Sequence, residues 1–297
     1  MSLKIVVLAK QVPDTRNVGK DAMKADGTIN RAALPAIFNP EDLNALEQAL
    51  RLKDEHPGST VTILTMGPGR AAEVIREGLY RGADNGYLLT DRAFAGADTL
   101  ATSYALATAI KKIGDYEIII GGRQAIDGDT AQVGPQVAEK LGLTQVTYAE
   151  EILNVDKASK KIVVKRHIDG GVETVEGPLP IVITVNGNAA PCRPRNAKLV
   201  QKYKRALGAQ EKAALTKDGA ALPYAELYES RPYLNIVEWS VADVNGDTKQ
   251  CGLSGSPTKV KKIENIIFQA KESKTITGSD ADVENLIVEL LANHTIG

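Results

Sequence analysis

The stretch that decides the fold of this 297-residue chain is Gly121-Gly122-Arg123-Gln124-Ala125-Ile126-Asp127-Gly128-Asp129-Thr130-Ala131-Gln132-Val133-Gly134-Pro135. It follows the apolar run Glu117–Ile120 and leads into a helical pattern that ends at Leu141-Gly142. A strand, a glycine-rich loop and a helix in this order place the loop at the carboxyl edge of a parallel sheet, where open α/β sheets bind their ligands. We expect the helix to begin near Thr130, with Asp129 or Thr130 as its N-cap.

Several features of this loop favour ligand binding over a plain connection. Gly121 and Gly122 allow close approach of the backbone, and Gly128 allows backbone angles that other residues avoid. The first N–H groups of the following helix form a phosphate site together with the helix dipole, and Arg123 can add charge-assisted hydrogen bonds. A fifteen-residue loop dense in Gly, Asp, Gln and Thr is also longer than a connection needs.

The first half of the chain alternates short apolar runs with helical patterns. This alternation is typical of a parallel sheet with helices on both faces. The expected strands are Lys4–Ala9, Thr60–Met66, Gly86–Leu89 and Glu117–Ile120, and further helices are expected after Asn39-Pro40-Glu41-Asp42, over Ala71–Tyr80 and over Asp98–Ile113. We therefore predict a mostly parallel, Rossmann-like α/β fold.

The pattern changes after about residue 145. The antiparallel strands expected there are Ala149–Val155, Lys161–Ile168 and Val172–Glu176, followed by Pro180–Val185, an apolar strand able to rejoin the main sheet. Ala209–Pro223 is typical of a linker or a peripheral helix, Cys251–Thr258 of an extended glycine-rich segment, and Asp282–Leu291 of an amphipathic helix. We expect an α/β domain over residues 1–205, including antiparallel strands within 147–177, and a C-terminal arm over 206–297.

Two shorter motifs add to the expected edge of the sheet. Gly67-Pro68-Gly69-Arg70-Ala71-Ala72 fits the dinucleotide pattern G-x-G-x-x-A, with Asp91 at about the spacing of the ribose-binding acid. We expect it to line a nucleotide pocket beside the longer loop. Asn39-Pro40-Glu41-Asp42 is a helix start, and the pattern leaves open whether it also contacts a ligand.

Composition excludes several classes of function. The net charge of −1 removes the electrostatic case for nucleic-acid binding. Cys192 and Cys251 fit neither a disulfide framework nor a metal cluster, and they suit a reducing cytoplasm. The N-terminal apolar run is too short for a signal peptide or a membrane span, so no membrane insertion is expected.

The chain also lacks the usual signs of catalysis by protein side chains. It contains no G-x-x-x-x-G-K-[ST] loop, which excludes a Walker-type NTPase. His56, His167 and His294 have no nearby nucleophile partner in the pattern and are expected at the surface. We expect neither catalytic residues nor metal ligands.

These motifs also resemble a known family, the β subunits of electron-transfer flavoproteins. The resemblance is carried by Val7-Leu8-Ala9-Lys10-Gln11-Val12-Pro13-Asp14, Asn39–Asp42, Gly82-Ala83-Asp84 and, most specifically, Gly122–Pro135, and it runs through about residue 205. It implies pairing with a larger α subunit that binds FAD, and an adenine nucleotide held by this chain.

The family has two branches, which differ in that nucleotide. Simple carriers hold AMP in the β subunit, whereas the electron-bifurcating branch and its nitrogen-fixation relatives hold a second FAD that receives hydride from NADH. Asp127–Pro135 is similar to the bifurcating form, and Cys251–Val260 resembles the C-terminal motif of the nitrogen-fixation relatives. The resemblance therefore implies FAD, with AMP as the alternative.

The resemblance also implies a cofactor site and partners. The implied cofactor-binding residues are Leu8, Ala9, Lys10, Asn39, Pro40, Glu41, Asp42, Met66, Gly67, Gly122, Arg123, Gln124, Ala125, Ile126, Asp127, Gly128, Asp129, Thr130, Ala131, Gln132 and Val133. The implied partners are the α subunit, wrapped by the C-terminal arm; ferredoxin or flavodoxin; and a flavin dehydrogenase such as an acyl-CoA dehydrogenase, reached through Arg193–Lys202. The residue at the family's hydrophobic anchor is Ala197, a departure that leaves the identity of this dehydrogenase open.

A rival of another class is an ATP-using adenylating enzyme on a related fold. Such an enzyme needs a Ser/Gly-rich pyrophosphate loop after the first strand. Lys10–Arg16 is not such a loop, so this rival is less favoured.

Overall fold

The structure is a computed structural model that describes residues 2–14, 35–258 and 275–292. The chain forms two compact units, Met1–Val260 and Lys261–Gly297. The first unit holds a nine-stranded sheet and a small two-stranded sheet. The second holds, within its described residues, the helix α9 (Asp280–Ala292), which confirms the expected terminal helix.

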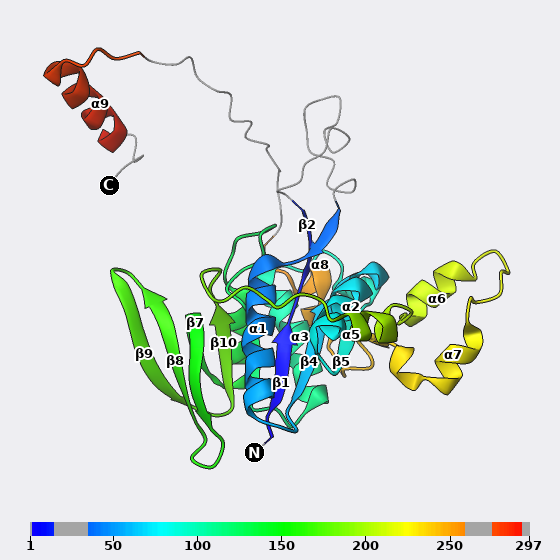
Figure 1. The fold of residues 1–297 in the computed structure, drawn as a ribbon. Helices are drawn as coiled ribbons and strands as arrows, with labels where there is room; N and C mark the ends of the chain where they lie inside the picture. The colour runs from blue at the N-terminus through cyan, green and yellow to red at the C-terminus, as the bar shows by residue number, and fades with distance from the viewer. Residues whose placement is uncertain (1, 15–34, 259–274, 293–297) are drawn as a thin grey trace. The chain divides into compact units, whose positions relative to one another are not determined.

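The large sheet has the strand order β11-β5-β4-β1-β6-β10-β7-β8-β9 (Figure 1). Its strands are β1 (Lys4–Leu8), β4 (Thr60–Met66), β5 (Asn85–Leu89), β6 (Ile118–Gly122), β7 (Thr144–Asp156), β8 (Lys161–Ile168), β9 (Gly171–Pro178), β10 (Ile181–Val185) and β11 (Val237–Trp239), and the small sheet pairs β2 (Gln11–Pro13) with β3 (Ala36–Phe38). The longer helices of this unit are α1 (Pro40–Glu55), α2 (Ala72–Arg81), α3 (Thr99–Ile113) and α4 (Val133–Leu141).

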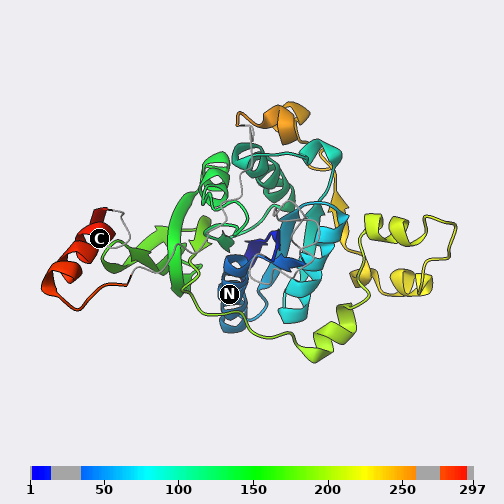
Figure 2. The same ribbon diagram turned by 90° about the horizontal axis from the view of Figure 1, so that it is seen from above.

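Helices cover both faces of the parallel part of the sheet. Alternate residues of β1 point to opposite faces, so that Ile5 and Val7 pack with α1 and α2, whereas Val6 and Leu8 pack with α3 and α4. Figure 2 shows the two helix layers on either side of the sheet. Because both faces are buried, the strands are apolar at consecutive positions, and the predicted α/β fold is confirmed.

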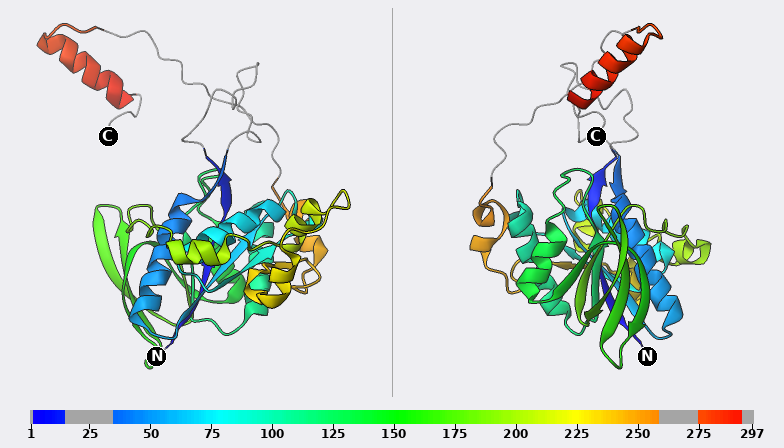
Figure 3. Two further views of the ribbon diagram at one scale, coloured as in Figure 1. Left: turned by 45° about the vertical axis from the view of Figure 1, so that its right-hand side comes forward. Right: turned by 90° about the vertical axis from the view of Figure 1, so that its left-hand side faces the viewer.

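The antiparallel strands extend one end of the same sheet. Strand β7 pairs in parallel with β10 and in antiparallel fashion with β8, and β8 pairs with β9. Figure 3 shows these strands from their own end. The expected strand over Pro180–Val185 does rejoin the main sheet, where β10 lies between β6 and β7.

The segment after residue 205 returns to the sheet, which the sequence pattern did not indicate. Strand β11 pairs in parallel with β5 at the sheet edge, and the compact unit continues to Val260. Short helices precede it: α5 (Ala197–Tyr203), α6 (Ala209–Leu215), α7 (Ala225–Ser230) and the 3-10 turn η4 (Pro232–Leu234). The peripheral-helix reading of Ala209–Pro223 is therefore confirmed for its first half.

Two local expectations are corrected by the structure. Cys251–Thr258 is not extended throughout, because the 3-10 turn η5 (Thr248–Gln250) leads into α8 (Gly252–Gly255), a single helical turn. Helix α4 begins at Val133 rather than near Thr130. The backbone at Asp129 and Ala131 has φ of +47° and +52°, outside the right-handed helical region, so the helix cannot start earlier. Within the described residues, no helix is both long and apolar enough to cross a bilayer.

Candidate functional site

The predicted loops converge on the carboxyl ends of three neighbouring strands. Strand β1 lies between β4 and β6, and Leu8 is in register with Leu64 on one side and Gly121 on the other. After β1 the chain forms β4 and β5 on one side of β1 and then β6 on its other side. The direction in which strands are added to the sheet therefore reverses beside β1. Such a switch point opens a crevice at the carboxyl edge of the sheet, where α/β proteins bind ligands.

Asp42, at the start of α1, joins the ends of two strands at this crevice. Its Oδ2 accepts the N–H of Lys10 at 2.8 Å, and its Oδ1 accepts the N–H of Gly122 at 2.9 Å. Burial raises the pKa of Asp42 to about 7, although hydrogen bonds from the Asn39 side chain and from these two N–H groups act in the opposite direction. The carboxyl group therefore has a structural role that sequence reading, which assigned it to ligand contact or capping, did not predict.

Asn39 and Glu41 hold the loop that follows β6. The Asn39 side chain makes no cap hydrogen bond; its amide donates to the carbonyl of Gln124 at 2.9 Å, and its oxygen accepts the N–H of Ile126 at 3.2 Å. Glu41 accepts from the N–H of Gln124 at 2.9 Å and from the guanidinium of Arg123 at 3.0 Å. The motif at the start of α1 therefore holds the backbone of the predicted binding loop in place.

Gly122 shows how closely the two pieces of backbone approach. A Cβ atom at this position would lie 2.5 Å from Oδ1 of Asp42 and 2.7 Å from the carbonyl carbon of Glu41. Contacts this short cannot be relieved by a side-chain rotation alone, because one of the atoms belongs to the backbone. A glycine is therefore required where β6 passes α1.

The part of the loop beyond Ile126 is open. Gly128, Asp129 and Thr130 are exposed, and a Cβ on Gly128 would have nothing within 4 Å. The Lys10 ammonium pairs with Asp127 at 2.7 Å, and the Gln124 amide donates to Asp129 at 2.8 Å. The two acidic side chains of the loop are thus partly compensated by neighbours.

The start of α4 offers a row of backbone donors. The N-cap is Gln132, without a side-chain cap hydrogen bond, so neither Asp129 nor Thr130 caps the helix as expected. Among the described residues, the N–H groups of 130–134 have no protein acceptor. Ala131 has positive φ and Gln132 is right-handed, a sequence of backbone angles that forms a concave set of donors suited to an anion. This donor set fits a phosphate group of a nucleotide.

The positive charge of Arg123 is less available to a ligand than the sequence suggested. Its guanidinium pairs with Glu41 and lies over the ring of Tyr148, 5.3 Å from the centroid. Its Nε is buried and has no partner among the described residues. The hydrogen bond from Arg123 to Glu41 raises the pKa of Arg123, so the group stays charged in a position fixed by α1.

The Gly67–Ala72 turn lies at the same edge but is covered. Gln210, in α6, packs against Gly69 and donates from its side chain to the Thr90 hydroxyl at 2.8 Å. Asp91 caps the 3-10 turn η3 (Arg92–Phe94) through the N–H of Ala93 at 3.0 Å. Its other oxygen accepts the N–H of Val241 at 3.1 Å, so Asp91 has a structural role in place of the ribose-binding role that its spacing suggested.

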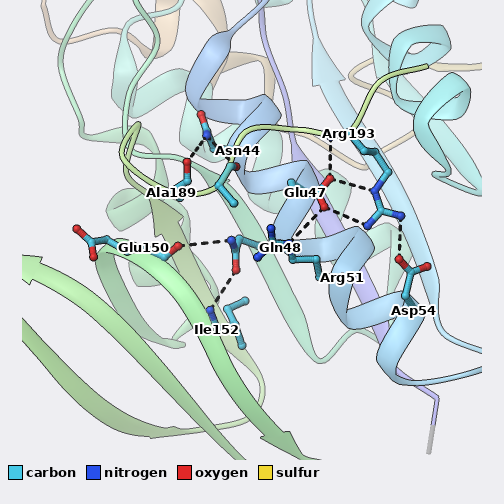
Figure 4. A network of polar contacts seen from close by, with 10 residues as sticks. Asn44, Glu47, Gln48, Arg51, Asp54, Glu150, Ile152, Ala189 and Arg193 are labelled. Atoms are coloured by element: carbon cyan, nitrogen blue, oxygen red, sulfur yellow. Dashed lines mark hydrogen bonds and ion pairs between the residues drawn. The ribbon is translucent and has the colours of Figure 1, made fainter. Parts of the chain in front are cut away.

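Helix α1 also fixes the segment that enters α5, a role that the sequence did not reveal (Figure 4). Glu47 accepts from the N–H of Arg193 at 2.9 Å and from its guanidinium at 3.0 Å, and the guanidinium reaches Asp54 at 2.8 Å. Burial opposes ionisation of Glu47, but the hydrogen bonds from Arg193 prevail and hold its pKa below the usual range. Gln48 donates to the carbonyl of Glu150 and accepts the N–H of Ile152, which ties β7 to the same helix.

A surface hollow lies away from these loops. It measures about 340 Å³ and is lined by residues of β7, β8 and β9, among them Thr147, Arg166 and Glu176. None of the predicted cofactor-binding residues lines it. This hollow is therefore not part of the predicted site.

The fold and the site define a doubly wound α/β protein with a phosphate-compatible loop at its switch point. Comparison with known proteins identifies the family to which this chain belongs. The family model of the electron transfer flavoprotein domain matches residues 26–216. Protein FixA of Azorhizobium caulinodans is 41% identical over 294 residues, covering 97% of this chain and 94% of the relative.

Two further relatives match over most of their length. The electron transfer flavoprotein subunit beta of Clostridium acetobutylicum is 43% identical over 260 residues, covering 88% of this chain and 87% of the relative. The caffeyl-CoA reductase-Etf complex subunit CarD of Acetobacterium woodii is 42% identical over 258 residues, covering 87% and 86%. The chain belongs to the electron transfer flavoprotein family.

Proposed function

We propose that this chain is the β subunit of a heterodimeric electron-transfer flavoprotein and that it holds FAD at the carboxyl edge of its sheet. Bound there, FAD would accept hydride from NADH and divide the electrons between ferredoxin or flavodoxin and the α-subunit FAD, which serves a flavin dehydrogenase of the acyl-CoA dehydrogenase type. The complex would lie in the cytoplasm, the reducing compartment that suits Cys192 and Cys251.

The observation that carries the proposal is the convergence of the Gly122–Val133 loop on the switch point. The N–H groups of 130–134 would bind the pyrophosphate, with the positive end of the α4 dipole behind them. Leu8, Ala9 and Met66 would border the nucleotide at the neighbouring strand ends. Asn39, Glu41 and Asp42 would keep the loop in its bound shape through the hydrogen bonds already present in the chain alone.

The flavin form is proposed over the AMP form because of the residues of the Asp127–Pro135 loop. Protein FixA and the subunit of the caffeyl-CoA reductase-Etf complex match this chain at 41% and 42% identity, and the FixA match covers 97% of the chain, beyond the point where the family model ends. The AMP-holding carrier remains the alternative within the family. The name of the CarD relative, a subunit of a caffeyl-CoA reductase-Etf complex, supports a CoA-linked reductase as a partner of this chain.

Arg193–Lys202 is the segment proposed to meet that dehydrogenase. Its base is fixed on α1 by the Glu47–Arg193 pair. Helix α5 then packs against α2 and the core through Leu199, Val200 and Tyr203, so the segment has a rigid support. A partner-binding segment held in this way loses less conformational entropy on association.

The adenylating enzyme is not favoured by the structure. Strand β1 is followed by Ala9, Lys10 and then β2, whose residues pair with β3. The described part of this connection, up to Asp14, contains neither serine nor glycine. No phosphate-binding loop therefore follows β1 in the described residues.

The test is an absorbance spectrum and nucleotide analysis of the purified complex with its α subunit, followed by titration with NADH. We expect two flavins per heterodimer, one of which is reduced by NADH. One FAD with AMP, and no response to NADH, would replace the bifurcating subunit by a simple carrier. Absence of any nucleotide from this chain would contradict the site itself.

A further inference from the structure

Residues 251–258, called the anchor segment here, pack tightly against the start of α3. Cys251 and Gly252 are buried, and a Cβ on Gly252 would lie 2.2 Å from the carbonyl oxygen of Ala93. The φ of Gly252 is +52°, which favours glycine. The N–H of Leu253 donates to the carbonyl of Ala95 at 3.1 Å. The segment is thus fitted to the loop before α3 by backbone contacts.

Asp98 is the residue through which the anchor segment reaches α3. Its Oδ1 caps the helix by accepting the N–H of Ala101 at 3.0 Å, while its Oδ2 accepts from the hydroxyl of Thr258 at 2.7 Å and from the Thr258 N–H at 3.1 Å. The N–H of Asp98 donates to the hydroxyl of Ser256 at 2.8 Å, and that hydroxyl donates to the carbonyl of Gly252 at 2.7 Å. Ser256 is buried. The cap of α3 is therefore shared with the anchor segment.

The same helix start touches the predicted cofactor loop. The hydroxyl of Thr99, the first residue of α3, donates to the side-chain oxygen of Gln132 at 2.8 Å. Gln132 is the N-cap of α4 and lies among the residues whose N–H groups are open to a ligand. The Gln136 amide approaches the same hydroxyl at 3.5 Å. Two sets of hydrogen bonds, one at Asp98 and one at Thr99, are joined by the peptide bond between these residues and so connect Thr258 with the binding loop.

We propose that the anchor segment is a positioning element of the cofactor site. Ser256 and Thr258 fix Asp98 and the first turn of α3, and Thr99 then fixes Gln132 at the mouth of α4. The donors of the loop are held in place by residues that lie more than a hundred positions later in the chain. This inference rests on the proposed function, because it assumes that the loop is where the nucleotide binds.

The test compares S256A and T258V with S254A in the complete complex with the α subunit. Ser254 is exposed, lies in α8 two residues before Ser256 and has no side-chain hydrogen bond among the described residues, so S254A is the matched control. The measurements are hydrogen exchange at Gly128, Asp129 and Gln136, whose N–H groups are hydrogen-bonded within the loop and the first turn of α4, and the dissociation constants of FAD and of AMP. Each hydrogen bond removed is expected to speed loop exchange and to weaken nucleotide binding by about twofold to tenfold.

Two further variants separate positioning from simple support. D98N keeps an oxygen to cap α3, since asparagine caps as well as aspartate, but its amide cannot accept from Thr258. It should loosen the loop as T258V does, without loss of α3 helicity. T99V breaks the path in its middle, so S256A introduced into T99V should loosen the loop no further.

The proposal is overturned if S256A combined with T258V loosens residues 251–258 but leaves loop exchange and nucleotide affinity at the wild-type values. It is also overturned if the same double variant does not loosen the anchor segment at all, because these hydrogen bonds would then not hold it. Loop exchange is measured both with and without nucleotide. A loop that responds to the variants in a protein that binds no nucleotide would support the coupling and contradict the proposed function.

Discussion

The two walls of the crevice are built in opposite ways. The α1 wall, formed by Asn39, Glu41 and Asp42, directs its polar atoms to the protein: each of these side chains accepts at least one backbone N–H. The α4 wall, residues 127–133, leaves the N–H groups of 130–133 without an acceptor among the described residues and exposes several of its side chains. One wall consists of buried polar groups satisfied internally, and the other offers unsatisfied donors to a ligand.

This difference separates the residues that shape the site from those that bind in it. Buried polar groups that satisfy one another make a rigid support, and a binding loop on a rigid support needs little reorganisation. Changes in the α1 wall should therefore lower the stability of the chain first and its ligand affinity second. Changes in the α4 wall should lower affinity with little effect on stability.

The largest expected effect is that of G122A. The new Cβ would meet Asp42 at 2.5 Å and the backbone of Glu41 at 2.7 Å, so β6 and α1 must move apart. We expect a loss of about 3 kcal/mol in the free energy of unfolding, measured by urea denaturation, together with loss of nucleotide.

The matched control is G128A in the same loop. A Cβ there has nothing within 4 Å, and Gly128 does not have positive φ. Its effect on the free energy of unfolding should stay within about 0.5 kcal/mol. If G122A were as stable as G128A, the close approach of α1 to β6 would not be a constraint, and the contrast between the walls would fail.

D42N is expected to have the next largest effect. An asparagine presents one oxygen and one amide nitrogen, so either Lys10 or Gly122 loses the acceptor for its N–H. Leaving one buried donor unsatisfied should cost about 1–2 kcal/mol. The measurement is the free energy of unfolding of wild type and D42N across pH.

The raised pKa of Asp42 determines whether the stability deficit of D42N grows or shrinks with pH. Burial raises the pKa of Asp42 to about 7, so the folded state holds the proton more tightly than the unfolded state. The wild-type stability from this group is full below the unfolded pKa of about 4 and is lost as pH rises toward 7. D42N has no such group, so its deficit relative to wild type should be greatest near pH 4 and should shrink by pH 8. A deficit that grows with pH would contradict the buried, high-pKa assignment of Asp42.

The α/β fold could be predicted because its signals are local. The consecutive apolar residues of Lys4–Leu8 and the start of α1 at Pro40 identify a parallel sheet and its helices without tertiary information. Strand β11 could not be found in this way, because its three residues form a strand only by pairing with β5. Helix α4 was expected three residues too early, because the positive φ of Ala131 is set by the loop and not by alanine.

The location of the site could be predicted, but not which residues support the loop and which are open to a ligand. Glycine content and the position after a strand are enough to indicate the Gly122–Val133 loop. The roles of Asp42 and Glu47 depend on partners at Gly122 and Arg193, 80 and 146 positions away, which no spacing rule indicates. Spacing can also mislead. Asp91 has the spacing of a ribose-binding acid, yet in the structure it caps a turn.

The smallest expected effect is at Lys10, where the two walls meet. The Lys10 ammonium pairs with Asp127 at 2.7 Å, and its side chain is about half exposed (49%), so K10Q should change the free energy of unfolding by less than about 0.5 kcal/mol. It should nevertheless weaken nucleotide binding, because the uncompensated Asp127 then repels the phosphates. At this exposure the repulsion is worth about 1 kcal/mol, or about fivefold in dissociation constant, and salt should reduce it.

D127N decides whether this charge argument is correct. Removing the carboxylate removes the repulsion, so D127N alone should bind the nucleotide at least as tightly as wild type, and K10Q with D127N should recover most of the affinity that K10Q loses. Titrations at low and high salt measure all four proteins. If K10Q and D127N weakened binding equally and additively, Lys10 and Asp127 would each contact the ligand directly. The α4 wall would then include charged side chains as binding groups, and the contrast with the α1 wall would rest on burial alone.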